Sequence, residues 1–175
     1  IQTSTLDTSG NGGVLDVDTT INLVLGLNVI DIVTGGVGVD FVLNNANLVI
    51  QGGADSFAVF RVNHVQESNF LITQGNIVVG DGGIGLNNVL FYSDDEDSGQ
   101  HFNFNNTILN GIAFWDLGAS GGEINIDNSQ GCVQLIADKV TLNDVRFNGC
   151  QFSAVPEPGT GTLLMLGLGT LAAIR

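Results

Sequence analysis

The sequence predicts an all-β body, wound as a right-handed β-solenoid, followed by a short hydrophobic C-terminal helix. Three observations predict it: short runs of alternating apolar residues, turns rich in glycine and asparagine, and no proline before residue 156. Glycine and asparagine tolerate the positive φ of tight turns, whereas proline would interrupt a β-ladder. No part of the body keeps a period of 3.6 residues over three turns, so we expect few helices there.

Strand-like segments follow one another along the whole body, with glycine-rich turns between them. Examples are 21–33, 39–51, 57–62, 76–80, 87–93, 102–110, 123–127, 132–137 and 139–149. Four pairs within them should each direct two apolar side chains to one face: Phe102 and Phe104, Ile124 and Ile126, Val140 and Leu142, Val145 and Phe147. Short strands of this kind suit a solenoid, a sandwich or a barrel.

Loosely related segments favour the solenoid over the sandwich, which stays the alternative. The segments 106–114, 131–142 and 144–150 look like successive rungs, spaced roughly twenty residues apart. The two cysteines fit such a stack, because Cys132 follows Gln-Gly and Cys150 follows Asn-Gly. Stacked strands lie about 4.8 Å apart, a spacing that a disulfide accepts. We therefore expect a structural disulfide, with two buried thiols as the alternative.

The charge balance excludes one class of partner. Four Lys and Arg residues stand against eighteen Asp and Glu, for a net charge of −14. Nucleic-acid binding needs clustered cations, and Arg61, Lys139, Arg146 and Arg175 form no cluster in the sequence. We expect no nucleic-acid partner. We expect a solvated acidic surface, and a specific role in attracting divalent cations is the alternative.

One acidic run is a candidate calcium site. Asp94, Asp95, Glu96 and Asp97 place four carboxylates together, and calcium prefers several oxygen ligands. The run lacks the spacing and the glycine of an EF-hand, so we expect a solvated loop and no cofactor, with a calcium site as the alternative. The two histidines, His64 and His101, lack the clustering of zinc ligands.

No nucleophile signature occurs, and we expect the protein not to be an enzyme. The alternative is a carbohydrate-active enzyme, either a hydrolase or a lyase, since hydrolysis needs two carboxylates across a groove. Its candidate residues are Asp116, Glu123, Asp127 and Asp138. Aromatic platforms for sugars are few, with Trp115 the single tryptophan and Tyr92 the single tyrosine.

The end of the sequence has a different character from the body. Val155-Pro156-Glu157-Pro158 breaks any strand, and the uncharged segment 159–174 precedes Arg175. We therefore divide the chain into a body, 1–154, and a tail, 155–175. As a helix, 159–174 would span roughly 24 Å, short of a hydrocarbon core of about 30 Å. A hydrophobic helix docked on the body is the alternative to a membrane segment.

This order of Val155, Pro156, Glu157 and Pro158, an apolar segment and a basic residue resembles the PEP-CTERM sorting signal of Gram-negative bacteria. The resemblance implies an exported protein, recognised and processed by exosortase, with the tail transiently inserted in the inner membrane and Arg175 on the cytoplasmic side. Two features of the family are missing, an N-terminal signal and several closing arginines. Truncation at both ends would explain both differences.

The body resembles, in pattern, bacterial choice-of-anchor domains and ice-binding-like β-solenoids. The matching stretches begin at Asn45, Gly85, Phe104 and Ser129, in the order of successive rungs. This implies an extracellular, non-enzymatic role. Together the two resemblances imply a cell-surface or matrix protein of structural or adhesin-like function, associated with biofilm, exopolysaccharide or other surface glycans. An ice-binding protein is a further alternative, although the threonines are scattered.

Overall fold

The computed structural model describes residues 1–62, 69–80, 82–93, 101–115 and 122–147, apart from the side chain of His101. Two short 3-10 helices, η1 (Ser9–Asn11) and η2 (Leu86–Asn88), accompany the strands. The strands are β1 (Gln2–Asp7), β2 (Val14–Leu15), β3 (Thr19–Asn22), β4 (Gly26–Val33), β5 (Phe41–Asn44), β6 (Asn47–Gln51), β7 (Ser56–Val62), β8 (Phe70–Thr73), β9 (Asn76–Val79), β10 (Val89–Ser93), β11 (His101–Asn105), β12 (Ile108–Trp115), β13 (Glu123–Asp127), β14 (Gln130–Ile136), β15 (Lys139–Asn143) and β16 (Arg146–Phe147). The expected all-β body is confirmed.

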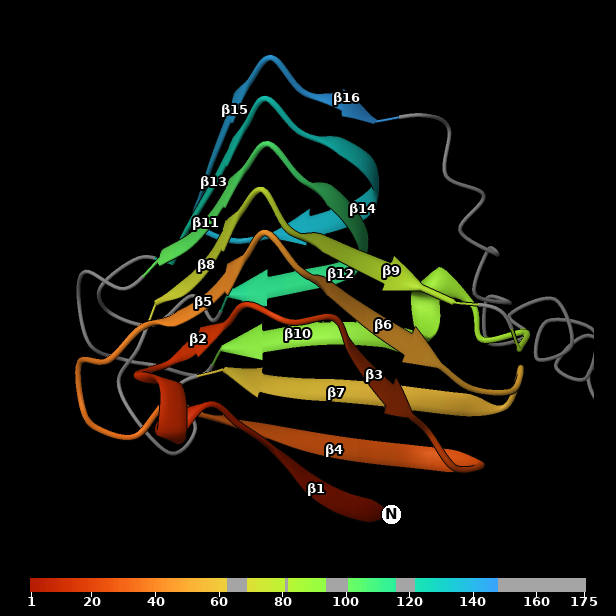
Figure 1. Cartoon of the computed structure of the whole chain (residues 1–175). Helices are drawn as coiled ribbons and strands as arrows, with labels where there is room; N and C mark the ends of the chain where they lie inside the picture. Colours follow the sequence, from red (N-terminus) through yellow and green to blue (C-terminus); the bar gives the residue numbers. More distant parts are fainter. Residues whose placement is uncertain (63–68, 81, 94–100, 116–121, 148–175) are drawn as a thin grey trace, which may run out of the picture.

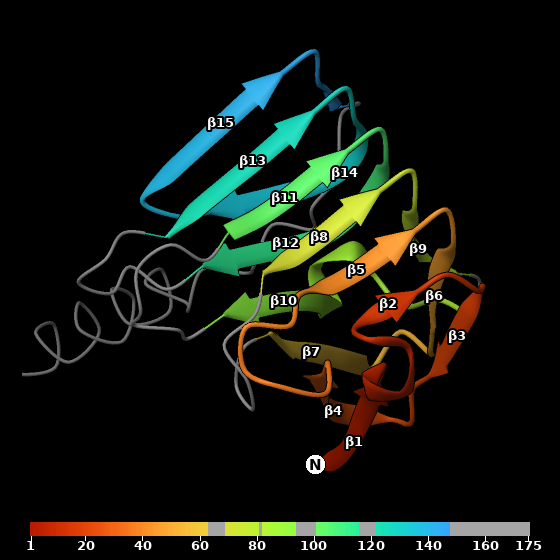
Figure 2. The same ribbon diagram turned by 60° about the vertical axis from the view of Figure 1, so that its left-hand side comes forward.

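Every strand pairing in the described residues is parallel, and the strands form two sheets. The six-stranded sheet, here called sheet B, has the order β15-β13-β11-β8-β5-β2, and Figure 2 shows its arrows side by side. The ten-stranded sheet A curls into two rows, β1-β4-β7-β10 and β3-β6-β9. The rows meet at β12, whose Ile108 pairs with Asn76 of β9 while its Ile112 pairs with Leu90 of β10.

Each strand pairs with a strand further along the chain, and we call the stretch between two register partners a circuit. Phe70 pairs with Phe102, Phe102 with Ile124 and Ile124 with Val140, so each of these circuits is shorter than the one before it. The expected spacing of about twenty residues therefore holds only near the C-terminal end. The circuits shorten because β12 and β14 each run through both rows of sheet A, and the molecule narrows accordingly (Figure 1).

Several segments that we expected to be single strands are pairs of strands. The range 39–51 divides into β5 and β6, 102–110 into β11 and β12, and 139–149 into β15 and β16. The chain turns a sharp corner between the members of each pair, at a residue with positive φ. These corner residues are Asn45, Gln74, Asn106, Asn128 and Asp144, with φ between 45° and 57°. Figure 1 shows the corners stacked in one line.

Backbone hydrogen bonds continue the parallel ladder around this corner. The amide of Asn106 donates to the carbonyl oxygen of Asp127 at 3.1 Å, and that of Asn128 donates to the carbonyl oxygen of Asn143 at 2.9 Å. The two earlier corner residues donate in the same way to the circuit that follows them. The corner is thus part of the sheet, so the side chains on it inherit the register of the strands.

Aromatic rings fill the space between the sheets. Phe41 and Phe70 stack with centroids 5.0 Å apart, and Phe70 lies 5.4 Å from Phe102 in the next circuit. Phe91 of sheet A approaches Phe70 to 5.5 Å, and Trp115 packs edge-on against Phe102. The inward direction of the pairs Phe102/Phe104 and Ile124/Ile126 is confirmed, since all four side chains are buried.

The last circuit is different, because its inward side chains are not covered. Val140 is 39% and Leu142 51% exposed, although their register partners Ile124 and Ile126 are buried. Val145 is half-buried and Phe147 is 36% exposed. The expected C-terminal helix lies outside the described residues. Among the helices that are described, none is long and apolar enough to cross a membrane.

Candidate functional site

The corner between the sheets carries two neighbouring outward side chains from each circuit. The last residue of a sheet B strand points outward, the corner residue with positive φ is exposed as well, and a small or β-branched residue then turns inward. In the three C-terminal circuits the outward residues are Asn105, Asn106, Asp127, Asn128, Asn143 and Asp144, all exposed. We call these six residues the amide corner. Thr107 and Ser129, which follow the corner, are buried.

Hydrogen bonds between circuits hold one pair of the amide corner in register, and also pairs of asparagines beside it. Nδ2 of Asn143 donates to Oδ1 of Asp127 at 2.8 Å, and Nδ2 of Asn125 donates to Oδ1 of Asn103 at 2.9 Å. Further down the molecule, Nδ2 of Asn76 donates to Asn47 at 2.8 Å. An asparagine has two N–H donors and an oxygen with two lone pairs. Such a ladder uses one donor and one lone pair, so hydrogen-bonding capacity is left for a ligand.

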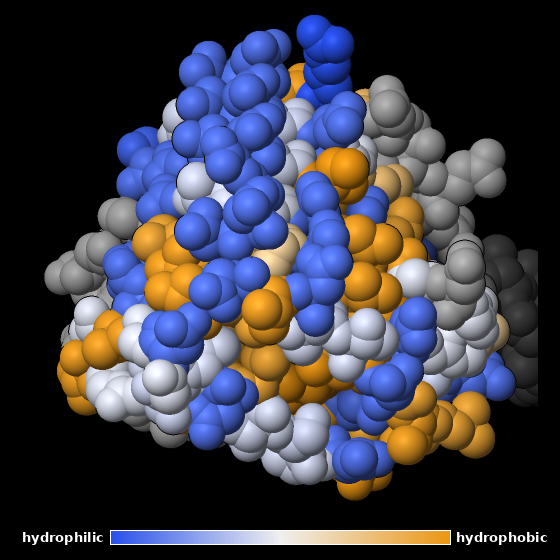
Figure 3. Space-filling view, viewed as in Figure 1, coloured by the Kyte–Doolittle hydropathy of each residue, from blue (hydrophilic) through white to orange (hydrophobic). Residues whose placement is uncertain are grey.

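Two hollows flank the amide corner. The larger, about 420 Å³, lies on the sheet A side, where Ile108, Gln130 and Arg146 line it next to the corner residues. The smaller, about 320 Å³, lies over sheet B between the Asn103–Asn125–Thr141 column and the outward ends of the same strands. Figure 3 shows hydrophilic stripes running up this face of the molecule. The larger hollow is lined mainly by polar groups, whereas the surface of the smaller hollow is mostly apolar.

Two of the cations that the structure describes are engaged by carboxylates. Arg61 of β7 meets Asp31 of β4 through two contacts, Nε to Oδ1 at 2.6 Å and the guanidinium NH2 nitrogen to Oδ2 at 2.8 Å. Lys139 of β15 lies 2.5 Å from Oε1 of Glu123. Arg146 lines the larger hollow. Three dispersed cations give no basic surface in this part of the chain.

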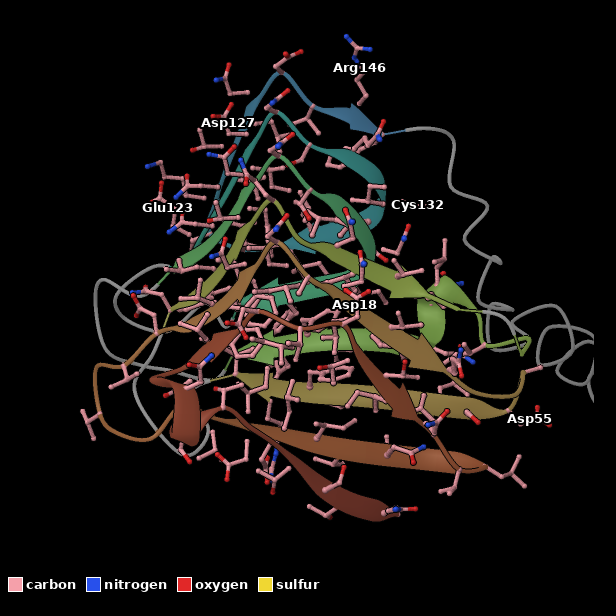
Figure 4. The ribbon with its side chains drawn as sticks, viewed as in Figure 1. Asp18, Asp55, Glu123, Asp127, Cys132 and Arg146 are labelled. Atoms are coloured by element: carbon pink, nitrogen blue, oxygen red, sulfur yellow. The ribbon has the colours of Figure 1, made fainter. Side chains whose placement is uncertain are left out.

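Two of the carboxylates that we considered for hydrolysis lie far apart. Glu123 and Asp127 stand at opposite ends of β13, so their backbone positions differ by about 13 Å along the strand. That separation exceeds the roughly 5–9.5 Å between the carboxyl groups of glycosidases. Asp138 lies in the turn before β15, and Asp116 falls outside the described residues. Figure 4 shows Glu123 and Asp127 on the sheet B side and Arg146 beyond the corner.

The single tryptophan and the single tyrosine offer little platform for a sugar. Trp115 is 2% exposed and belongs to the core. Tyr92 is half-buried on the outer side of β10, where its ring stacks on Phe114 with centroids 5.5 Å apart. The threonines form no array on the described part of sheet B, since the column that contains Thr141 continues with Asn125 and Asn103.

Several residues singled out in the sequence cannot be placed. Asp94, Asp95, Glu96 and Asp97 and also His64 lie outside the described residues, and His101 is placed only by its backbone on β11. The described ranges contain no group of three or more His, Cys, Asp or Glu side chains that could hold a metal ion. The calcium site therefore stays a prediction.

The pairing of Cys132 with Cys150 also stays a prediction. Cys132 lies on β14, half-buried, and no cysteine in the described residues is free. Cys150 lies outside them. The sequence separation between Cys132 and Cys150 is slightly larger than that between Gln130 and Arg146. The latter two residues are register partners on β14 and β16.

The amide corner has a sequence signal of its own, which was not among the expected rungs. Five segments share the order apolar, any, apolar, polar, polar, small or β-branched. They are 41–46 (FVLNNA), 70–75 (FLITQG), 102–107 (FNFNNT), 124–129 (INIDNS) and 140–145 (VTLNDV). The fourth and fifth positions are the outward pair of the corner. Aligning the chain on this pattern would have located every sheet B strand except β2.

The sorting residues Val155, Pro156, Glu157, Pro158 and Arg175 lie outside the described residues, so the comparison with known families bears on them instead. No curated protein and no solved structure matches the chain. Residues 154–175, however, match the family model of the PEP-CTERM protein-sorting motif. The chain therefore carries the C-terminal signal of exported proteins that exosortase processes at the membrane.

Proposed function

We propose that the protein is an exported cell-surface or matrix protein, in which a right-handed β-solenoid body is delivered by its sorting tail and presents the amide corner to glycans. The role is structural or adhesin-like, within a biofilm or exopolysaccharide matrix, and it requires neither catalysis nor a cofactor. The observation that carries the proposal is the sorting motif at 154–175, because it directs the protein to the membrane.

The arrangement of the strands supports the solenoid. Strands pair in parallel from one circuit to the next, in both sheets. Parallel connections are right-handed in about 98% of known cases, which favours the right-handed form. A solenoid is stabilised by contacts between neighbouring circuits, and the continuous column of core rings from Phe41 to Phe102 supplies such contacts. A rod of this kind suits an exposed, protease-rich location.

The chemistry of the amide corner supports a neutral glycan as the ligand. Asparagine side chains offer both donors and acceptors, as sugar hydroxyl groups do. The hollows run beside a regular column of such groups over three circuits. A net charge of −14 disfavours acidic polymers, since like charges repel at low salt. Glycan-binding surfaces often rely on aromatic stacking, and here hydrogen bonds would have to replace it.

Ice binding is the second candidate function, and the in-register outer surface of sheet B favours it. Side chains there repeat across strands at about 4.8 Å, which is the regularity that an ice lattice demands. Asn103, Asn125 and Thr141 occupy one such column. A measurement of thermal hysteresis separates the two candidates, since a glycan-binding protein leaves the freezing point of its solution at the colligative value.

The sorting step is tested by expressing the full-length gene in an exosortase-positive host and in its deletion strain, and measuring the intact mass of the product. We expect loss of the tail only in the positive host. Alanine replacements of Pro156, Glu157 and Pro158 should abolish that loss, while Gln151→Ala, upstream of the motif, should not. An identical uncleaved tail in both hosts would refute the sorting proposal.

A further inference from the structure

The C-terminal end of the body exposes the continuation of its own core. Val140 and Leu142 point to the inner side of sheet B, in register with Ile124 and Ile126, which are 0% and 1% exposed. Val140 and Leu142 are 39% and 51% exposed. The exposures differ because β15 is the edge strand of sheet B in the described residues. One edge of its backbone therefore lacks a described strand partner.

The opposite end of the body is finished differently. The edge strands of that end are β1, β2 and β3. The inward positions of β1 begin with Gln2 and Ser4, which pair with Asn28 and Ile30. Both are exposed and polar. Solenoids remain soluble when their terminal repeats present a polar face. The first inward positions of β1 meet this condition, whereas Val140 and Leu142 at the C-terminal end do not.

The chain's own continuation is a poor cover for β15. The last circuit runs from Ile124 to Val140. A further circuit of the same length would place Pro156 opposite Val140 and Pro158 opposite Leu142. Proline has no N–H group to donate and is confined to edges and bulges of sheets. The stretch between β16 and the motif, 148–153, reaches only about 20 Å when extended. A further circuit of this length would therefore carry two residues without an N–H group in the strand beside β15.

We propose that the open edge of β15 pairs with the β15 edge of a second copy. A two-fold axis at Thr141 makes the two strands antiparallel, so that Val140 of each copy lies opposite Leu142 of the other. Lys139 then lies opposite Asn143, while Asp138 and Asp144, which flank the strand, come opposite one another and contribute a repulsion between like charges. Such an interface is self-complementary and closes as a dimer rather than growing into a fibre. It also buries the two most uncovered core positions of sheet B.

The charge of the whole chain determines how this dimer responds to salt. Two copies carrying −14 each repel one another, and salt screens that repulsion over about 10 Å at 0.1 M. We therefore expect association to strengthen as salt rises. The contact is confined to one strand and its apolar neighbours, smaller than interfaces of standard size, so dissociation constants in the micromolar range or above are expected.

The test is sedimentation equilibrium of the full chain in mild detergent, from low micromolar to millimolar concentration. We expect Leu142→Lys to raise the dissociation constant at least tenfold. The matched control is Leu25→Lys, at a residue 78% exposed and distant in sequence from β15, and it should leave the constant unchanged. A monomer over the whole range, or a dimer that survives Leu142→Lys, overturns the proposal. If the dimer survives Leu142→Lys, we would attribute the association to the apolar tail.

A cross-linking variant tests the geometry directly. Residues opposite one another in antiparallel strands have Cβ atoms about 4.5–5.5 Å apart, close to the range that a disulfide spans. With the two-fold axis at Thr141, Thr141→Cys should form a covalent dimer under mild oxidation. Thr20→Cys, on the exposed side of β3, should stay monomeric. Equal cross-linking of both variants would contradict the pairing of β15 with itself.

Discussion

The residues with positive φ divide into two groups with different consequences. Asparagine, glutamine and aspartate occupy the stacked corner, where φ is 45–57° and the side chains are exposed. Asparagine and aspartate tolerate this left-handed region better than most residues, so the corner keeps a functional side chain at small cost. Gly111 and Gly131 have φ of 116° and 139°, a region that is essentially restricted to glycine.

Gly131 should be intolerant of any side chain. A Cβ built there would clash with the carbonyl oxygen of Leu109 in the preceding circuit, and the backbone conformation adds strain. We expect Gly131→Ala to lower the free energy of unfolding by about 3 kcal/mol or more, measured by urea denaturation. Gly53→Ala is the control, because its Cβ would meet nothing within 4 Å and its backbone lies outside the left-handed region. A similar loss in both variants would contradict this account.

At the scale of the elements, the sequence could predict only those features that depend on local patterns. The inward direction of Phe102 and Phe104 follows from alternation, which is a property of the strand itself. The corners were missed because Asn-Asn, Thr-Gln, Asp-Asn and Asn-Asp share chemistry without sharing letters. The circuits also differ in length along sheet B, and the last two are successively shorter, so the sequence has no fixed period. The exposure of Val140 could not be predicted from the sequence either, since it depends on whether another circuit follows.

The aromatic stack should hold neighbouring circuits together. Phe70 is fully buried and its ring lies within 6.0 Å of those of Phe41, Phe91, Phe102 and Phe104. Truncation to alanine removes contacts with both sheets and leaves a cavity. We expect Phe70→Ala to cost about 3–5 kcal/mol of unfolding free energy. Phe57→Ala, at a ring that is 46% exposed, should cost much less. Equal costs in urea denaturation would mean that the stack contributes no special stability.

At the scale of the whole molecule, the two ends and the corner have separate tasks. The C-terminal end exposes apolar core positions, and the amide corner lies in the three circuits next to that end (Figure 1). A two-fold dimer at the apolar end would bring two amide corners into one particle. Two weak sites in one particle bind a polymer more tightly than either alone, provided that the polymer reaches both. Dimerisation and glycan binding would then reinforce each other.

At the proposed glycan site, we predict that removing two amide side chains weakens glycan binding without any change of charge. Asn125 and Asn143 line the smaller hollow and donate its ladder hydrogen bonds, and each amide has a second N–H that a ligand can accept. A hydrogen bond contributes about 0.5–1.5 kcal/mol net, so losing two should weaken binding roughly tenfold. We expect Asn125→Ala with Asn143→Ala to reduce the affinity for a neutral polysaccharide by that factor in isothermal titration calorimetry. The affinity should change little with salt, because no ion pair is involved.

The control for this double variant removes two amide side chains at a different place on the surface. Asn22 and Gln51 are register partners on β3 and β6, away from both hollows, and their replacement by alanine should leave the affinity unchanged. Equal losses in the two double variants would mean that the polymer binds amides anywhere on the surface. A steep weakening with salt would instead point to charged contacts through Arg146 or Lys139. Either result would remove the amide corner from its proposed role while leaving the sorting of the protein untouched.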